Sequence, residues 1–102
     1  MDDVINSYIK DEIKKNEVVL FMKGTPEYPQ CGFSGRVVQI LESLNVCYKG
    51  INILIDENLR QAIKEYSQWP TIPQLYVKGE FIGGCDIICE MFESGEIHKI
   101  LK

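Results

Sequence analysis

Cys31 is the residue with the clearest capacity for chemistry. It lies in a segment rich in Gly and Pro, directly before residues whose apolar spacing predicts a helix. The free backbone N–H groups and the positive dipole of a helix N-terminus stabilise a thiolate and so lower the pKa of a thiol. Lys23, at the end of the preceding predicted strand, would act in the same direction. A thiolate serves disulfide exchange as a nucleophile and iron–sulfur binding as a soft ligand, and the position alone leaves both open.

Ser34 occupies the position at which a dithiol oxidoreductase carries its second cysteine, in a Cys-x-x-Cys pair. A hydroxyl cannot resolve a mixed disulfide. The two-thiol route of reduction is therefore closed unless another cysteine, or a free thiol from solution, takes this part. We expect Cys31 to act as a single thiol.

The other cysteines carry weaker signals. Cys47 lies between Val46 and Tyr48 in a strand-like pattern, which favours a position in the core. Cys85 and Cys89 are four residues apart, so that one helix face could present both to a metal. Two ligands without a nearby His or a further Cys are an incomplete site, so this pair alone predicts little.

Hydrophobic spacing predicts an α/β chain that would position these groups. Apolar residues at helical spacing predict helices over 4–13, 33–44, 57–66 and 86–101. Short apolar runs predict strands over 18–22, 46–55, 74–77 and 80–82. A strand–helix–strand unit pairs in parallel, whereas the last two strands, joined at Lys78-Gly79, form an antiparallel hairpin. The order therefore predicts one four-stranded mixed sheet flanked by helices on both faces.

The composition is that of an ordinary globule, and we predict a single domain over residues 1–102. Of the 102 residues 45% are hydrophobic and 25% charged. The longest apolar run, Val18 to Met22, is far shorter than the ~20 residues of a membrane span. A net charge of −4 disfavours binding to nucleic acid or to an anionic membrane. The first residues do not resemble a signal peptide, so we expect a reducing, cytoplasmic location.

Three segments in register resemble the monothiol glutaredoxins with a Cys-Gly-Phe-Ser motif. They are Lys23-Gly24-Thr25-Pro26 with Cys31-Gly32-Phe33-Ser34, then Trp69-Pro70-Thr71-Ile72-Pro73-Gln74, and last Gly83-Gly84-Cys85-Asp86. Their order and spacing extend from residue 23 to residue 86, which makes the resemblance specific. It implies a thioredoxin-like (glutaredoxin) fold of the α/β class, a groove for glutathione beside Cys31 and a cis peptide bond before Pro73.

The resemblance also assigns residues to glutathione, a small anion with an extended backbone. Lys23 and Arg60 would hold its glycine carboxylate, and Asp86 would face its ammonium group. The backbone near Thr71 would pair with the cysteinyl unit, and Cys85 would lie at the γ-glutamyl end. The complete set is Lys23, Arg60, Thr71, Ile72, Pro73, Gly84, Cys85 and Asp86.

Residue types alone would give several nearby positions ordinary structural roles. Arg60 and Lys64 lie on a predicted helix, where such residues usually form a solvated face. Trp69 is interpreted as a packing residue beside the loop rather than a direct ligand contact. His98 stands alone and is interpreted as a solvated or helix-end residue.

Two functions follow from the resemblance. In the first, the Cys31 thiolates of two chains and two glutathione thiolates ligate a [2Fe–2S] cluster. This cluster would bridge a homodimer and be transferred to apo iron–sulfur acceptor proteins, with a BolA-like protein as a further partner. In the second, Cys31 is the sole nucleophile of a glutathione-dependent thiol–disulfide oxidoreductase. Because exchangeable glutathione ligands favour release of the cluster, we expect the carrier, with only weak oxidoreductase activity.

Overall fold

Four strands form one mixed sheet in the computed structural model, which describes residues 3–101. The strands are β1 Val18–Met22, β2 Lys49–Asn52, β3 Gln74–Val77 and β4 Glu80–Gly83. Their order across the sheet is β2-β1-β3-β4. The β1 strand pairs in parallel with β2 and antiparallel with β3, which pairs antiparallel with β4. The predicted four-stranded mixed sheet is confirmed.

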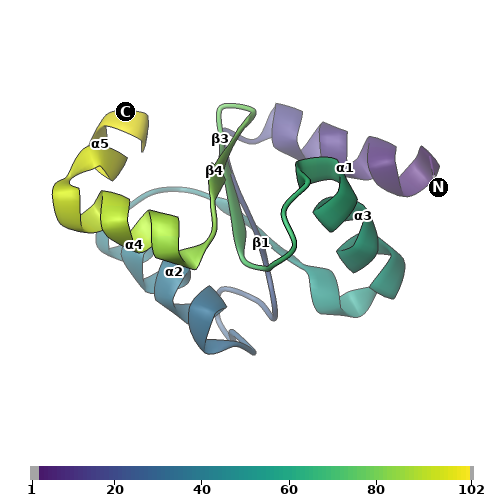
Figure 1. Ribbon diagram of the computed structural model, residues 1–102, viewed down its shortest axis with the longest axis horizontal. Coiled ribbons are helices and arrows are strands. Elements are labelled where there is room, and N and C mark those ends of the chain that lie inside the picture. The colour runs from purple at the N-terminus through teal and green to yellow at the C-terminus, as the bar shows by residue number, and fades with distance from the viewer. Residues whose placement is uncertain (1–2, 102) are drawn as a thin grey trace.

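Helices cover both faces of this sheet. They are α1 Asp3–Lys15, α2 Gly32–Ser43, α3 Glu57–Ser67, α4 Cys85–Ser94 and α5 Glu96–Leu101. The pair α1 and α3 lies against one face, and α2, α4 and α5 lie against the other (Figure 1). Within the described residues, no helix has the length and apolar character needed to cross a bilayer.

The β1 strand shows why two helical layers are needed. Successive side chains of a strand point to opposite faces, and all five residues of β1 are apolar and buried. Val19 and Phe21 belong to the core beneath α1 and α3. Val18, Leu20 and Met22 belong to the core beneath α2 and α4. A strand that is apolar on both faces is stable only when both are covered.

Two predicted elements were too long. The expected strand over 46–55 is only Lys49–Asn52, because the Asn52 side chain accepts a hydrogen bond of 2.9 Å from the Leu54 backbone N–H and starts a 3-10 helix, η1, at Ile53–Ile55. The expected helix over 86–101 is two helices. Gly95 ends α4 with a left-handed φ of 82°, a conformation that glycine adopts at little cost.

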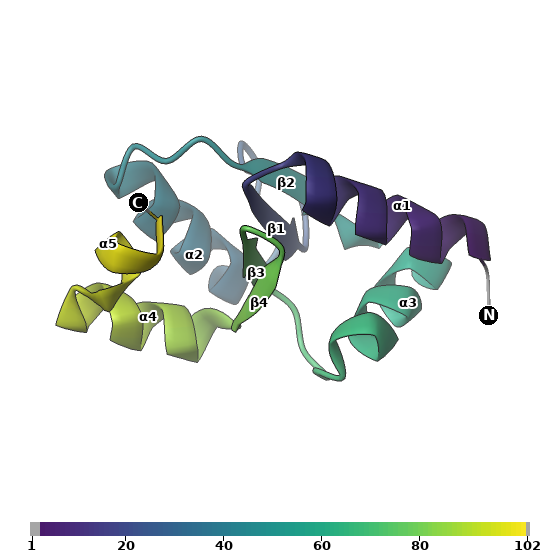
Figure 2. The same ribbon diagram turned by 90° about the horizontal axis from the view of Figure 1, so that it is seen from above.

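The prediction that Cys47 is a core residue was wrong, because its side chain is exposed. The residue lies in the connection between α2 and β2 (Figure 2). Its neighbours Val46 and Tyr48 are partly buried against the core beneath α2. In an extended chain adjacent side chains point in opposite directions, so burial of these two leaves the cysteine in solvent.

Candidate functional site

Cys31 is the N-cap residue of α2. Its backbone is extended, with φ −150° and ψ 136°, and its side chain is half-buried. The strand β1 ends nine residues earlier at Met22, so the intervening segment must return the chain to the sheet. The sulfur is therefore placed at the junction of a helix N-terminus and the end of a central strand.

The surroundings of Cys31 lower the pKa of its thiol. The backbone N–H of Ser34 has the largest effect, and it outweighs the opposing effect of burial. The N–H of Phe33 and the ammonium group of Lys23 act in the same direction. These groups stabilise the thiolate, as the sequence predicts for a helix N-terminus. The thiol is thus activated for nucleophilic attack or metal ligation.

Ser34 is completely buried, with 0% of its surface exposed. The backbone N–H of Lys23 donates a hydrogen bond of 3.1 Å to the Ser34 Oγ. Its hydroxyl therefore joins the end of β1 to the first turn of α2. The residue type indicated that Ser34 lacks a thiol, but not that it has this structural role.

The segment between Gly24 and Gln30 is a compact turn. Tyr28 donates a backbone hydrogen bond of 3.0 Å to the Thr25 carbonyl, and Gln30 donates one of 2.9 Å to the Lys23 carbonyl. Gly24 has a φ of 92°, and a Cβ there would lie 2.5 Å from the Gln30 nitrogen. Only glycine fits at this point, because both the backbone angle and the close contact exclude a side chain.

A pocket of about 470 Å³ opens beside Cys31, within the size range of small-molecule sites. Every residue that the sequence assigned to the site contributes to its wall. The lining residues are Lys23, Cys31, Phe33, Arg60, Lys64, Trp69, Pro70, Thr71, Ile72, Pro73, Gly84, Cys85, Asp86 and Ile87. The tertiary structure thus brings together the residue that follows β1, residues of α2, α3 and α4, the loop before β3 and the junction of β4 and α4.

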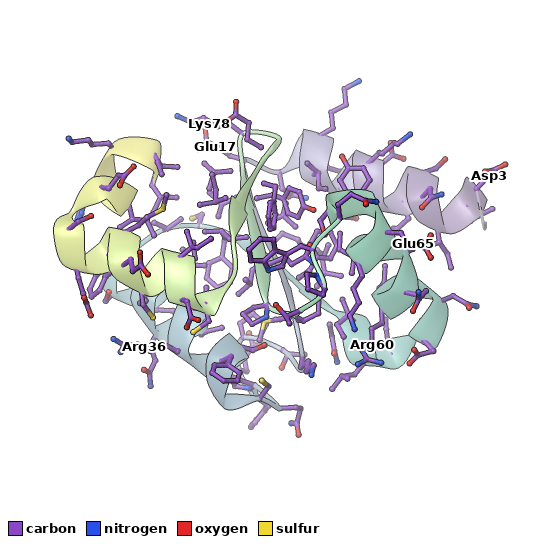
Figure 3. The ribbon with its side chains drawn as sticks, viewed as in Figure 1. Asp3, Glu17, Arg36, Arg60, Glu65 and Lys78 are labelled. Carbon is purple, nitrogen blue, oxygen red and sulfur yellow. The ribbon has the colours of Figure 1, made fainter. Side chains whose placement is uncertain are left out.

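The charges of the pocket are segregated. Cations come from Lys23 and from Arg60 and Lys64 on α3, whereas Asp86 stands at the start of α4. Arg60 is partly exposed and forms an ion pair of 3.4 Å with Glu57 on the same helix. Figure 3 shows Arg60 at the lower edge of the molecule, on the side of the sheet away from α4. The arrangement suits an extended ligand with carboxylates at one end and an ammonium group at the other.

The loop from Trp69 to Pro73 forms the wall between the cations and α4. The Ile72–Pro73 peptide bond is cis, as the resemblance implies. The buried Gln74 side chain donates hydrogen bonds of 3.2 Å to the carbonyls of Trp69 and Thr71. These bonds fix the course of the loop, so that its backbone is held along the pocket.

The sequence interpretation missed several lining residues, namely Phe33, Lys64, Trp69, Pro70 and Ile87. Lys64 lies four residues after Arg60, and that spacing places two cations on one helix face. This was the signal that could have identified it. Trp69 and Pro70 stand in the quoted segment Trp69 to Gln74, which was the signal for them. For Ile87 the sequence held no comparable signal, because its role depends on how the loop and α4 approach each other.

Trp69 both packs and lines the pocket. Its ring lies 5.5 Å from that of Phe81, centroid to centroid, which agrees with the predicted packing role. Its indole Nε1 is buried without a hydrogen-bond partner among the described residues. A Cβ on Gly84 would lie 3.3 Å from this nitrogen. A side chain at position 84 would therefore be in tight contact with the indole ring.

The fold and the site together define a thioredoxin-like protein with one activated thiol beside a charged pocket. The sequence profile of the family described as glutaredoxin matches residues 18–82. A probable monothiol glutaredoxin of Rickettsia typhi is 57% identical over 95 residues, covering 93% of this chain and 86% of the relative. The chain belongs to the glutaredoxin family, and Ser34 in place of a second cysteine places it among the monothiol members.

Solved structures show the same fold. The solution structure of a reduced apo glutaredoxin from poplar has a TM-score of 0.83 and 55% identity, covering 93% of this chain and 87% of that chain. A buckwheat glutaredoxin in complex with glutathione has a TM-score of 0.85 at 23% identity, covering 96% of this chain and 87% of that chain. The predicted glutaredoxin-type fold is confirmed.

Proposed function

We propose that this chain binds glutathione in the pocket beside Cys31 and carries a [2Fe–2S] cluster between proteins. In this proposal two copies share the cluster, each contributing its Cys31 thiolate and one bound glutathione. The observation that carries the proposal is a half-buried thiol of lowered pKa on the wall of a charged pocket, with a buried serine where a second cysteine would stand.

Glutathione binding is supported by the chemistry of the pocket. Lys23 and Arg60 offer cations to a carboxylate, and Asp86 offers a carboxylate to an ammonium group. The loop at Thr71 to Pro73 offers backbone hydrogen-bonding groups to an extended peptide. The buckwheat protein, which shares this fold, is known as a glutathione complex. We therefore assign the ligand roles to the predicted residues, with Gly84 and Cys85 completing the wall beneath the γ-glutamyl end.

The need for a second chain follows from ligand counting. A [2Fe–2S] cluster takes four ligands, as a rule thiolates. Between residues 3 and 101 no three Cys, His, Asp or Glu side chains gather where they could hold a metal. Cys31 with one glutathione supplies two thiolates, so two such units complete the set. The cluster is cargo in this scheme, and acceptor apo-proteins receive it.

The surface around Cys31 suits such a contact. Tyr28 and Phe33 flank the cysteine in sequence and are 75% and 63% exposed. Large apolar side chains with this exposure are common at protein interfaces. We propose that they meet the second copy, or a BolA-like partner that would replace one copy around a shared cluster.

The lowered pKa of Cys31 also favours the alternative function. A thiolate can attack the mixed disulfide of a glutathionylated protein, and a second glutathione can regenerate it. This route needs only the single thiol and the same pocket. The two functions therefore differ in whether the complex retains a cluster, and not in the residues used.

Anaerobic reconstitution separates them. The protein is incubated with iron, sulfide and glutathione, and its visible spectrum and mass in solution are recorded. A coloured dimer that forms only with glutathione and becomes a colourless monomer on chelation supports the carrier. A Cys31→Ser variant should stay colourless, with a Cys47→Ser variant as the matched control. A colourless monomer with deglutathionylation turnover would overturn the carrier in favour of the oxidoreductase.

A further inference from the structure

Cys85 and Cys89 form a second thiol cluster that the proposed function does not use as a pair. Their sulfur atoms lie 3.9 Å apart on α4. Both side chains are half-buried, so that neither is closed off from solvent. Each is a free cysteine. The sequence spacing allowed a shared helix face, and the structure adds that the two sulfurs meet.

The separation of the sulfurs is that of two ligands on one metal ion. Metal–sulfur bonds of about 2.3 Å place two sulfurs about 3.8 Å apart at a tetrahedral angle and about 4.0 Å apart at a trigonal angle. The observed 3.9 Å lies between these values. A cation that has a third ligand could therefore bind both sulfurs with little movement of the helix, whereas a linear two-sulfur arrangement would need them about 4.6 Å apart. The fully buried Ile88 fixes this part of α4 on the core, which keeps the pair in place.

We propose that Cys85 and Cys89 are a two-thiolate site for a thiophilic d10 cation, with Cu(I) the best fit. The described residues hold no third protein ligand in the group, which disfavours ions that need four protein donors. Cu(I) selects soft thiolates. Cys85 lines the pocket, so a small thiol bound there could supply a third sulfur.

The charges around the two sulfurs are compatible with a complex of two thiolates and Cu(I). Binding of Cu(I) releases both thiol protons to solvent and leaves one net negative charge on the two sulfurs and the metal. Arg36, on α2 beside α4, acts on Cys85 as a favourable cation, whereas Asp86 acts against a thiolate. Figure 3 shows Arg36 on α2, below α4. Without a metal, burial and the neighbouring Cys89 raise the pKa of Cys85 to about 11, so the Cys85 thiol remains protonated at neutral pH.

The test uses the full-length chain with Cys31→Ser, which removes the thiol reserved for the cluster. Cu(I) is supplied anaerobically as a complex with a chromophoric chelator, without glutathione. We expect uptake of one Cu(I) per chain, measured as loss of the chelator's colour. X-ray absorption should show two sulfur neighbours per copper. Adding Cys85→Ser or Cys89→Ser should weaken uptake about 100-fold or more, because the second thiolate binds intramolecularly.

Cys47→Ser in the same background is the matched control and should leave uptake unchanged. Cys89→Ala is a second variant, and circular dichroism checks that each protein is folded. Equal Cu(I) uptake with and without Cys89, or no uptake by the parent chain, would overturn the site. Because Cys31 and glutathione are both absent, such a failure would leave the proposed cluster function untouched.

Discussion

The backbone N–H of Lys23 lies 3.1 Å from the Ser34 Oγ, and this hydrogen bond ties the end of β1 to the first turn of α2. Both residues also act on Cys31, whose pKa is lowered by the Ser34 backbone and by the Lys23 ammonium group. One contact therefore links the stability of the junction to the state of the thiol. Ser34 therefore has a structural role of its own, in addition to lacking a thiol.

Replacing Ser34 with alanine should destabilise the protein. The Lys23 N–H loses its acceptor in a partly buried place, which costs about 1–3 kcal/mol. Urea unfolding measures the loss, with Ser7→Ala at an exposed position of α1 as control. The pKa of Cys31 should also rise slightly, because the Ser34 side chain helps to lower it. Equal stability of the two variants would contradict a structural role for the Ser34 hydroxyl.

Removing a pocket cation should weaken glutathione binding. Each of Lys23→Ala and Arg60→Ala removes a charge-assisted hydrogen bond of roughly 1.5–3 kcal/mol, or about tenfold or more in Kd. Trp69 is the single tryptophan of the chain and lines the pocket, so its fluorescence can follow binding. The exposed Lys10→Ala on α1 is the control. If neither pocket variant differs from this control, the glutathione assignment fails.

The pH dependence of alkylation should distinguish Cys31 from Cys85. The thiolate is the reactive form, so a lowered pKa moves the onset of reaction to lower pH and a raised pKa moves it to higher pH. Cys31 should react below the pH of a free thiol, whose pKa is about 8.5. Cys85 should reach half of its maximal reaction rate only near pH 11. Mass-spectrometric mapping of the modified residues gives both profiles, and coincident profiles would refute the assignment.

The turn before Cys31 can be tested with two matched glycines. Gly24 and Gly79 have φ values of 92° and 85°, but a Cβ would meet backbone atoms at 2.5 Å only at Gly24. Gly79→Ala should cost about 1 kcal/mol from the backbone angle alone. Gly24→Ala should cost clearly more and should slow the reaction of Cys31. Equal losses in chemical denaturation would show that crowding at Gly24 is relieved by movement of the turn.

The sequence by itself determined the element order and the chemistry available to Cys31. Apolar runs and helical spacing located the sheet and the principal helices, because burial imposes these periods on any chain. The role of Cys31 followed from its place before a predicted helix, whereas the ligand roles predicted for Lys23 and Asp86 came from the family resemblance. The absence of a thiol at Ser34 was equally plain.

Only the tertiary structure decided which residues meet. Cys47 is exposed because β2 begins only after it. The helix α4 ends at Gly95 because the backbone there has a left-handed φ angle. Lys64 and Ile87 line the same pocket because of the way α3 and α4 are placed on the two sides of the sheet. The contact of the Cys85 and Cys89 sulfurs depends on the rotamers that packing selects. Such long-range and side-chain relationships are set by the packing of the whole core, which no short segment of sequence encodes.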